Sequence, residues 1–154
     1  MLDKKYFDLV RQELLDYSAK RRGIIKEAGD AQFLAKKAIF ALQRDDAGEA
    51  QNYLSQAEKI LVDLNLKYKK DLGIFEEGSY KAALEEFVEA SIFNQYLQKK
   101  NIGKLPKIQV DSDIFIGGLC DVPGELLRYA IKSATEKKFE EVKRCRHVAD
   151  EIIV

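Results

Sequence analysis

The chain has few of the residues that build disulfide scaffolds and thiolate metal sites. Its 154 residues include one histidine and two cysteines. Cys120 and Cys145 form no CxxC motif, and we expect Cys120 to be a small core residue. This content argues against a disulfide-bonded scaffold and favours a reduced compartment, so we expect a cytoplasmic protein.

Long apolar runs are also missing. No stretch approaches the roughly 20 apolar residues that cross a bilayer. The N-terminus, MetLeuAspLysLysTyrPheAsp, lacks the apolar run of a signal peptide, and we expect no membrane partner. Excess charge of one sign is absent as well, because Lys plus Arg and Asp plus Glu both number 26. Neutrality neither indicates nor excludes nucleic-acid binding, since charge can be segregated by face.

Glycine and proline are sparse, with nine and two residues, while 46% of the chain is hydrophobic and 34% charged. This length suits one domain with a substantial core, which we expect to span residues 1–154. Apolar residues recur at spacings of three and four, and no segment has the pattern of a β-hairpin. We therefore predict an all-α fold, an antiparallel bundle of about six helices.

The predicted helices follow the apolar stripes and the breaks between them. Gly29 and Asp30 are expected to end one helix and cap the next, and loops are expected near residues 73–78 and 103–106. The six helices cover about residues 2–27, 31–44, 50–68, 80–100, 112–131 and 136–152. The fourth is apolar on several faces, which is typical of a central helix.

Two acidic pairs differ from the other carboxylates of the chain. Glu86 and Glu89, in LeuGluGluPheValGluAla, have no basic residue at helical spacing on their face. Asp121 and Glu125, in GlyLeuCysAspValProGlyGluLeuLeuArg, lie four apart and point the same way from a helix. Buried like charges are costly unless they are protonated, paired or bound to a cation. The four acids are therefore a candidate metal site, with an ion pair between Glu125 and Arg128 as the alternative.

The helix that carries Asp121 and Glu125 is weak by composition. Pro123 in a helix interior removes a hydrogen bond and costs ~3 kcal/mol or more. Each nearby glycine costs about 1 kcal/mol relative to alanine; these glycines are Gly117, Gly118 and Gly124. They are explained either by close packing of two helices or by a site that a ligand approaches closely.

The type of metal follows from the available ligands. Zinc and di-iron sites favour cysteine or histidine, and the one histidine, His147, lies outside any ExxH or HxxxH spacing. A set of carboxylate oxygens suits Mg²⁺ or Mn²⁺. Such ions usually serve phosphate chemistry, where they polarise a phosphoryl oxygen and activate water.

Two phrases resemble the signature segments of the translin family. They are GlyLeuCysAspValProGlyGluLeuLeuArg and GluPheValGluAlaSerIlePhe. They are more similar to the catalytic branch, TRAX (translin-associated factor X), and to the TRAX-like proteins of archaea. The segment ArgAspAspAlaGlyGluAlaGlnAsnTyrLeuSerGlnAlaGluLysIle is similar to the family's second-to-third helix junction. The resemblance covers roughly residues 5–150.

The resemblance implies a translin-like helical fold and a metal-dependent endoribonuclease that cuts single-stranded RNA, with single-stranded DNA as a second candidate. It places the catalytic and metal-binding acids at Glu86, Glu89 and Asp121, with Glu125 as a further acid. Translin itself has lost most of these acids and binds RNA as a partner, so four acids favour the catalytic branch. The resemblance also implies a homo-oligomer. The family's usual last C-terminal helix would follow Val154, and the chain is expected to lack it.

Basic residues on the first two predicted helices are candidates for RNA contacts. Arg21 and Arg22 are the first candidates for phosphate contacts, within a basic cluster that begins at Lys20. Further candidates on the second predicted helix are Lys36, Lys37 and Arg44; each is also consistent with a solvated face.

Two rival functions stay open from the sequence. One rival function is a non-catalytic RNA-binding subunit. The other is a helical protein-interaction module, although its tetratricopeptide-like phrases are too far apart for that repeat's ~34-residue period.

Overall fold

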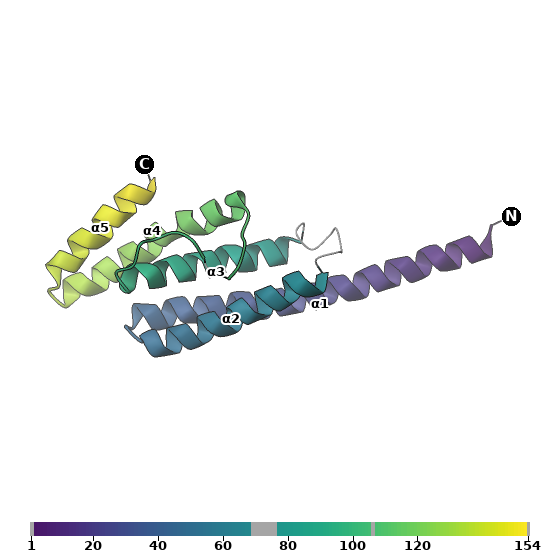
Figure 1. Ribbon diagram of the computed structural model, residues 1–154, viewed down its shortest axis with the longest axis horizontal. Coiled ribbons are helices and arrows are strands. Elements are labelled where there is room, and N and C mark those ends of the chain that lie inside the picture. Colours follow the sequence, from purple (N-terminus) through teal and green to yellow (C-terminus); the bar gives the residue numbers. More distant parts are fainter. Residues whose placement is uncertain (1, 69–76, 106, 154) are drawn as a thin grey trace.

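The computed structural model describes residues 2–68, 77–105 and 107–153. These residues form five helices and no strand: α1 (Lys4–Gln43), α2 (Ala47–Tyr68), α3 (Gly78–Leu97), α4 (Ser112–Thr135) and α5 (Phe139–Ile153). Helices α1, α2 and α3 run back and forth in an elongated bundle, whereas α4 runs in the same direction as α3 (Figure 1). Gly118 of α4 lies beside Glu85 of α3, and Tyr129 lies beside Phe93 farther along both helices, so the predicted antiparallel arrangement does not hold for this pair. The all-α prediction is confirmed, and the predicted count of about six helices is wrong. Gly73 and Pro106, on which two predicted breaks depend, lie outside the described residues.

Helix α1 is continuous over 40 residues where the sequence predicts two helices. It begins after Asp3, whose side chain accepts a hydrogen bond from the backbone N–H of Tyr6 at 3.2 Å. Gly29 and Asp30 lie in its interior, and a Cβ on Gly29 would have no atom within 4 Å. A glycine there costs only about 1 kcal/mol. The buried alanines on both sides, such as Ala28 and Ala31, pack in one unbroken stripe, and this packing outweighs the cost.

Helix α3 is the centre of the bundle, as its broad hydrophobicity predicts. It packs against α1, α2 and α4, and α5 packs on α4. Helix α2 returns along α1 and buries one apolar face, formed by Ala50, Leu54, Ala57, Leu61, Leu64 and Tyr68. The central position of α3 brings residues of α1 and α4 to the same region of its surface.

Helices α3 and α4 approach each other closely at two glycines. A Cβ on Gly118 would lie 2.4 Å from the carbonyl oxygen of Glu85 and 2.7 Å from Cβ of Val88. A Cβ on Gly117 would lie 2.9 Å from Oε1 of Glu85. Close packing therefore explains these two glycines. It does not explain Gly124, where a Cβ would have no atom within 4 Å.

Helix α5 is fixed to the end of α3 by a polar cluster. The Tyr96 hydroxyl donates to Glu141 at 2.6 Å and lies 3.1 Å from the Cys145 thiol. The Arg144 guanidinium lies over the Tyr96 ring, 4.1 Å from its centroid. Cys145 is buried here, whereas Cys120 is exposed on α4, so the expectation that Cys120 is a core residue is wrong.

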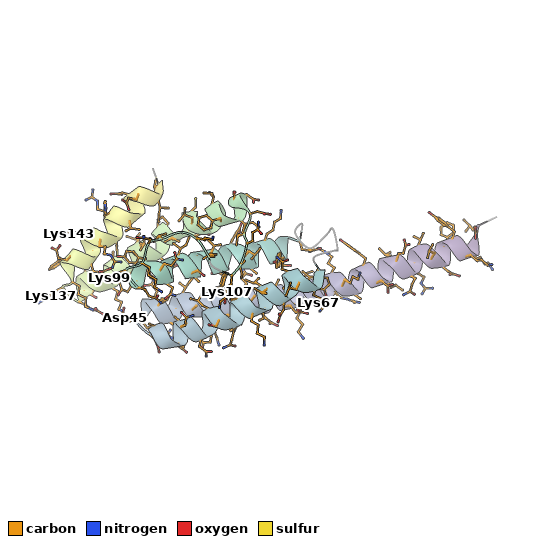
Figure 2. All side chains as sticks on the ribbon, viewed as in Figure 1. Asp45, Lys67, Lys99, Lys107, Lys137 and Lys143 are labelled. Atoms are coloured by element: carbon orange, nitrogen blue, oxygen red, sulfur yellow. The ribbon has the colours of Figure 1, made fainter. Side chains whose placement is uncertain are left out.

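The first half of α1 projects beyond the other helices (Figure 1). Its side chains stand out with no other element beside them (Figure 2). Seven large apolar residues of this segment have 40% to 62% of their surface exposed: Tyr6, Phe7, Leu9, Val10, Leu14, Leu15 and Tyr17. No helix in the described part of the chain is long and apolar enough to cross a membrane.

Candidate functional site

The two acidic pairs lie where α3 and α4 pack together. Glu86 and Glu89 lie on α3, and Asp121 and Glu125 lie on α4. Glu89 and Glu125 are buried, with 9% and 8% of their surface exposed. Glu86 is half-buried and Asp121 is exposed, so the acids extend from the interior of the helix pair to its surface. The close approach at Gly118 is what allows the two pairs to share this region.

The charges of the four acids act on one another. The pKa of Glu89 is raised to about 8, mainly by burial. The negative charges of Glu86, Glu125 and Asp121 raise it further, and Lys36 acts in the opposite direction. Because all three other acids contribute, the four carboxylates form one electrostatic cluster. At neutral pH Glu89 holds a proton in this cluster.

A lysine from α1 partly neutralises the α3 pair. Lys36 Nζ lies 3.5 Å from a carboxylate oxygen of Glu86, and about half of the Lys36 side chain is exposed. Burial raises the pKa of Glu86, while Lys36 and Gln32 lower it. Spacing within α3 could not have revealed Lys36 as the partner, because it lies 50 residues earlier on another helix.

Two polar side chains orient Glu125. Gln43, at the end of α1, donates from Nε2 to Glu125 Oε2 at 2.8 Å and to the Glu125 carbonyl at 3.0 Å. Arg128 donates from its guanidinium to both carboxylate oxygens of Glu125, at 3.0 and 3.2 Å. The ion pair that the sequence offered as an alternative for Glu125 is therefore present. Among the described residues, no ion pair joins Glu86, Glu89 or Asp121 to a basic side chain of α3 or α4.

The donor set of this cluster fits a hard cation. Carboxylate oxygens are the ligands that Mg²⁺ and Mn²⁺ prefer, and Glu89 is surrounded by more negative charge than Lys36 offsets. In the ranges that the structure describes, however, no three acidic, histidine or cysteine side chains lie close enough to hold one metal ion. The acids thus share a region and an electrostatic field, and their side chains do not meet at one point.

The predicted RNA contacts lie away from the acids. Arg21 donates from Nε to Glu77 Oε1 at 2.7 Å, and this ion pair links α1 to the start of α3. Arg22 is exposed. At 1.5 Å per residue, Arg21 is about 22 Å along α1 from Lys36. The structure therefore brings Lys36 to the acidic cluster and does not bring Arg21 or Arg22 there.

The model of the translin family matches residues 19–152. The chain belongs to the translin family. The matched residues include both acidic pairs, Lys36 and Gln43. No curated protein matches the chain.

Solved structures share the fold of this family member. Apo-NeC3PO has a TM-score of 0.85 and 21% identity, over 99% of this chain and 80% of that chain. AfC3PO has a TM-score of 0.86 and 23% identity, over 96% of this chain and 76% of that chain. A complex of AfC3PO with duplex RNA has a TM-score of 0.83 and 23% identity, over 96% of this chain and 75% of that chain. These likenesses establish the translin-like fold over nearly the whole chain.

Proposed function

We propose that this translin-family protein is a cation-dependent endoribonuclease of the TRAX-like, archaeal type. The observation that carries the proposal is the cluster of Glu86, Glu89, Asp121 and Glu125, in which every other acid raises the pKa of Glu89. A buried carboxylate is costly to maintain without a cation, a proton or an ion pair. Arg128 and Gln43 satisfy Glu125, whereas Glu89 stays buried among three other acids and takes up a proton in place of a cation. A helix pair that only needed to pack would be more stable with apolar residues at these positions.

Mg²⁺ or Mn²⁺ is the proposed cofactor, with the four acids as its proposed ligands. Because no three acidic side chains of the described residues meet at one point, binding requires them to turn towards a shared ion. When bound, such an ion polarises a phosphoryl oxygen and lowers the pKa of a bound water. Glu125 is held in a fixed orientation by Gln43 and Arg128. Asp121 is exposed, which leaves its carboxylate accessible to a cation and to a phosphate beside it.

Lys36 is the proposed phosphate contact of the site. Its ammonium lies beside Glu86, and its side chain is half exposed, so it can turn towards a strand at the edge of the cluster. Lysine binds phosphate as a point charge without a fixed geometry. Arg21 and Arg22 are proposed to contact the same strand farther along α1, at a distance of a few nucleotides.

Single-stranded RNA is the proposed substrate, with single-stranded DNA as the second candidate. Support for nucleic acid as the ligand comes from the family and from the duplex RNA bound to AfC3PO, which has the same fold. The preference for single strands comes from the TRAX-like resemblance. A cytoplasmic location stays a prediction from the cysteine content.

A second copy of the chain is the proposed protein partner. The exposed apolar residues at 6, 10, 14 and 17 recur at helical spacing, and the same face continues into the buried residues Ile24, Ala28 and Ala31. A face that is core in one half of a helix and exposed in the other is typical of an interface. The homo-oligomer is proposed to form through this half of α1.

A cleavage assay tests the function. Labelled single-stranded RNA is incubated with Mn²⁺ or Mg²⁺ and with wild type, Asp121→Asn, Glu89→Gln or Glu140→Gln. Glu140 is an exposed acid on α5 that pairs with Lys143, and it serves as the control. Wild type and the control should cut, and the two cluster variants should not.

The same assay separates the rival functions. Equal cleavage by all four proteins would remove the four acids from the active site. Binding of RNA without cleavage by any of them would indicate a non-catalytic RNA-binding subunit. Neither binding nor cleavage would indicate a helical protein-interaction module.

A further inference from the structure

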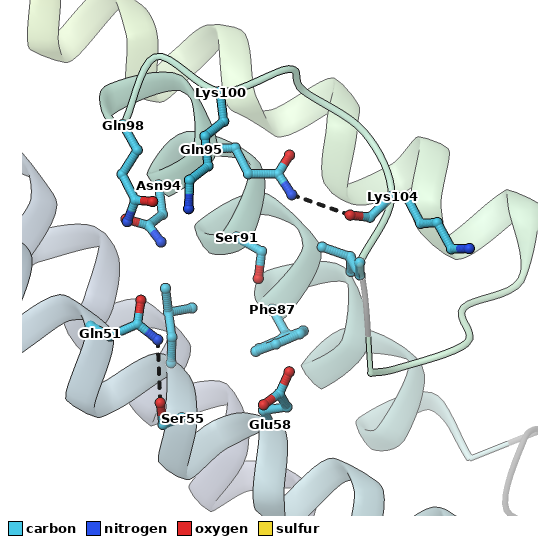
Figure 3. Close-up of a pocket in the computed structure, with 12 residues that line it drawn as sticks. Gln51, Ser55, Glu58, Phe87, Ser91, Asn94, Gln95, Gln98, Lys100 and Lys104 are labelled. Carbon is cyan, nitrogen blue, oxygen red and sulfur yellow. Dashed lines mark hydrogen bonds between the residues drawn. The ribbon is translucent and has the colours of Figure 1, made fainter.

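A polar cavity lies on the other side of α3 from the acidic cluster. It has a volume of about 530 Å³ and is bounded by α2, α3 and the loop after α3 (Figure 3). Asn94 and Gln98 line it. At 3.6 residues per turn, these positions point away from the face of α3 that carries Glu86 and Glu89. The cavity is therefore separate from the proposed active site.

One glutamine fixes the loop that forms a wall of the cavity. Gln95 donates from Nε2 to the carbonyl of Lys104 at 3.3 Å, and its Oε1 accepts from the N–H of Gly103 at 2.9 Å. Gly103 has φ +154°, a conformation that other residues rarely adopt. The loop is thus held against α3 by both ends of one amide, and Lys100 lies at the rim.

The cavity offers hydrogen-bond donors and acceptors side by side. Gln98 donates from Nε2 to Oδ1 of Asn94 at 3.0 Å, which leaves the Asn94 amide N–H and the Gln98 carbonyl for a ligand. Gln51 donates from Nε2 to the Ser55 hydroxyl at 3.3 Å, which leaves the Gln51 carbonyl. Asparagine and glutamine amides match the edges of nucleobases, which also carry donors beside acceptors.

The charge of the cavity is positive at its rim. The one carboxylate in its lining, Glu58, is paired with Lys107 at 2.8 Å. Lys100 and Lys104 have no acidic partner within 4 Å among the described residues. Figure 3 shows the Lys100 ammonium beside the Asn94 and Gln98 amides, whereas the Lys104 side chain points away from them. An ammonium group beside neutral amides suits a phosphate.

The floor of the cavity is apolar. Leu54, Phe87 and Leu105 form it and are themselves buried beneath the polar lining. A ligand that fits this arrangement has a flat face of low polarity, an edge with donors and acceptors, and an anionic group. The volume lies in the range of about 300 to 1,000 Å³ that is usual for small-molecule sites.

We propose that this cavity binds one nucleotide, with the base between the apolar floor and the amides and the phosphate at Lys100. The proposal rests on the proposed function for the source of the nucleotide, which is an unpaired residue of an RNA strand. A free mononucleotide has the same chemistry and is the second source. Because the cavity lies across α3 from the acids, it would hold a strand outside the cleavage site.

Calorimetry on the full chain with AMP, adenosine and ribose 5-phosphate tests the proposal. AMP should bind most tightly because it carries both the base and the phosphate. The variant Asn94→Ala with Gln98→Ala should weaken AMP and adenosine about fivefold or more. The variant Lys100→Ala at the rim should weaken AMP and ribose 5-phosphate about tenfold and leave adenosine unchanged.

Lys104→Ala is the matched control, because the Lys104 side chain points away from the cavity and its removal should leave AMP binding intact. The proposal is overturned if AMP does not bind at millimolar concentration, or if the control weakens AMP as much as the rim variant does. A short single-stranded RNA that displaces AMP identifies the strand as the source, and AMP binding without displacement identifies the free nucleotide. Glu89→Gln should keep AMP binding, so loss of cleavage and loss of the cavity's ligand are distinguishable.

Discussion

Glu89 is the residue whose chemistry depends most on its surroundings. Its pKa is raised to about 8, so the folded protein keeps a proton there that the unfolded chain loses near the ordinary glutamate value of 4.5. Between these two pH values the folded state binds more protons than the unfolded state. Stability therefore falls as pH rises from about 4.5 to about 8, and the full penalty is present above that range.

Replacing Glu89 by glutamine should remove this pH dependence in metal-free protein. Glutamine resembles the protonated acid, so the free energies of unfolding of Glu89→Gln and wild type should be similar near pH 4.5. At pH 9 the variant should be more stable by roughly 2–4 kcal/mol. Urea denaturation in EDTA across this range measures the difference. Parallel curves for the two proteins would contradict the assignment, and Glu140→Gln should follow wild type throughout.

For single residues, the sequence predicts which acids belong to the cluster better than it predicts which side chains pair with them. Glu86 and Glu89 stand out because their own helix supplies no basic neighbour, and helical spacing is enough to see this. Lys36 and Gln43 complete the cluster from α1. Contacts between helices depend on how the helices pack, and periodicity within one helix carries no information about that.

The packing of α3 on α4 depends on Gly118. No side chain fits there, because a Cβ would overlap the backbone carbonyl of Glu85 and the side chain of Val88. The sequence identified the glycines and left two explanations for them. The structure supports close packing at Gly117 and Gly118. It gives no account of Pro123, through which α4 continues.

Gly118→Ala should force the two helices apart. We expect a loss of about 1–3 kcal/mol in the free energy of unfolding, as for other overpacked positions, and reduced cleavage because the acidic pairs would separate. Gly124→Ala on the same helix is the matched control, since it meets no atom within 4 Å. It should gain up to about 1 kcal/mol from helix propensity. Equal effects of the two substitutions, measured by urea denaturation, would refute the close-packing explanation.

Helix α1 shows the limit of local signals for helix ends. Gly29 followed by Asp30 is a common sequence for a helix end and a new cap. The chain nevertheless continues as one helix, because Ala28, Ala31 and Ala35 pack against the neighbouring helices without interruption. Tertiary packing of this kind outweighs a penalty of about 1 kcal/mol.

For the whole molecule, the fold class and the family could be predicted from periodicity and two short phrases. The projection of α1 could not, because its apolar stripe looks the same whether it is covered by the chain itself or by another molecule. The stripe through Tyr6, Val10 and Leu14 continues the buried stripe and is exposed in the single chain.

Leu14→Glu should weaken the proposed self-association. Leu14 is largely exposed in the single chain, so the substitution should change the fold little while placing a charge in the interface. Light scattering after gel filtration should give a lower mass than for wild type at the same concentration. Gln12→Glu, on the opposite face of the same segment, should leave the mass unchanged. An unchanged mass for Leu14→Glu would exclude this face as the interface.

The cleavage rate of Asp121→Asn tests the proposed function of the molecule most directly. Asp121 is exposed, so Asp121→Asn removes one charge of the cluster without disturbing a buried position. Glu89→Gln, by contrast, changes a buried side chain. With single-stranded RNA and saturating Mn²⁺, the rate for Asp121→Asn should fall about a hundredfold or more below wild type. Glu140→Gln should cut at the wild-type rate. Cleavage by Asp121→Asn at the rate of wild type would contradict a catalytic role for the acidic cluster.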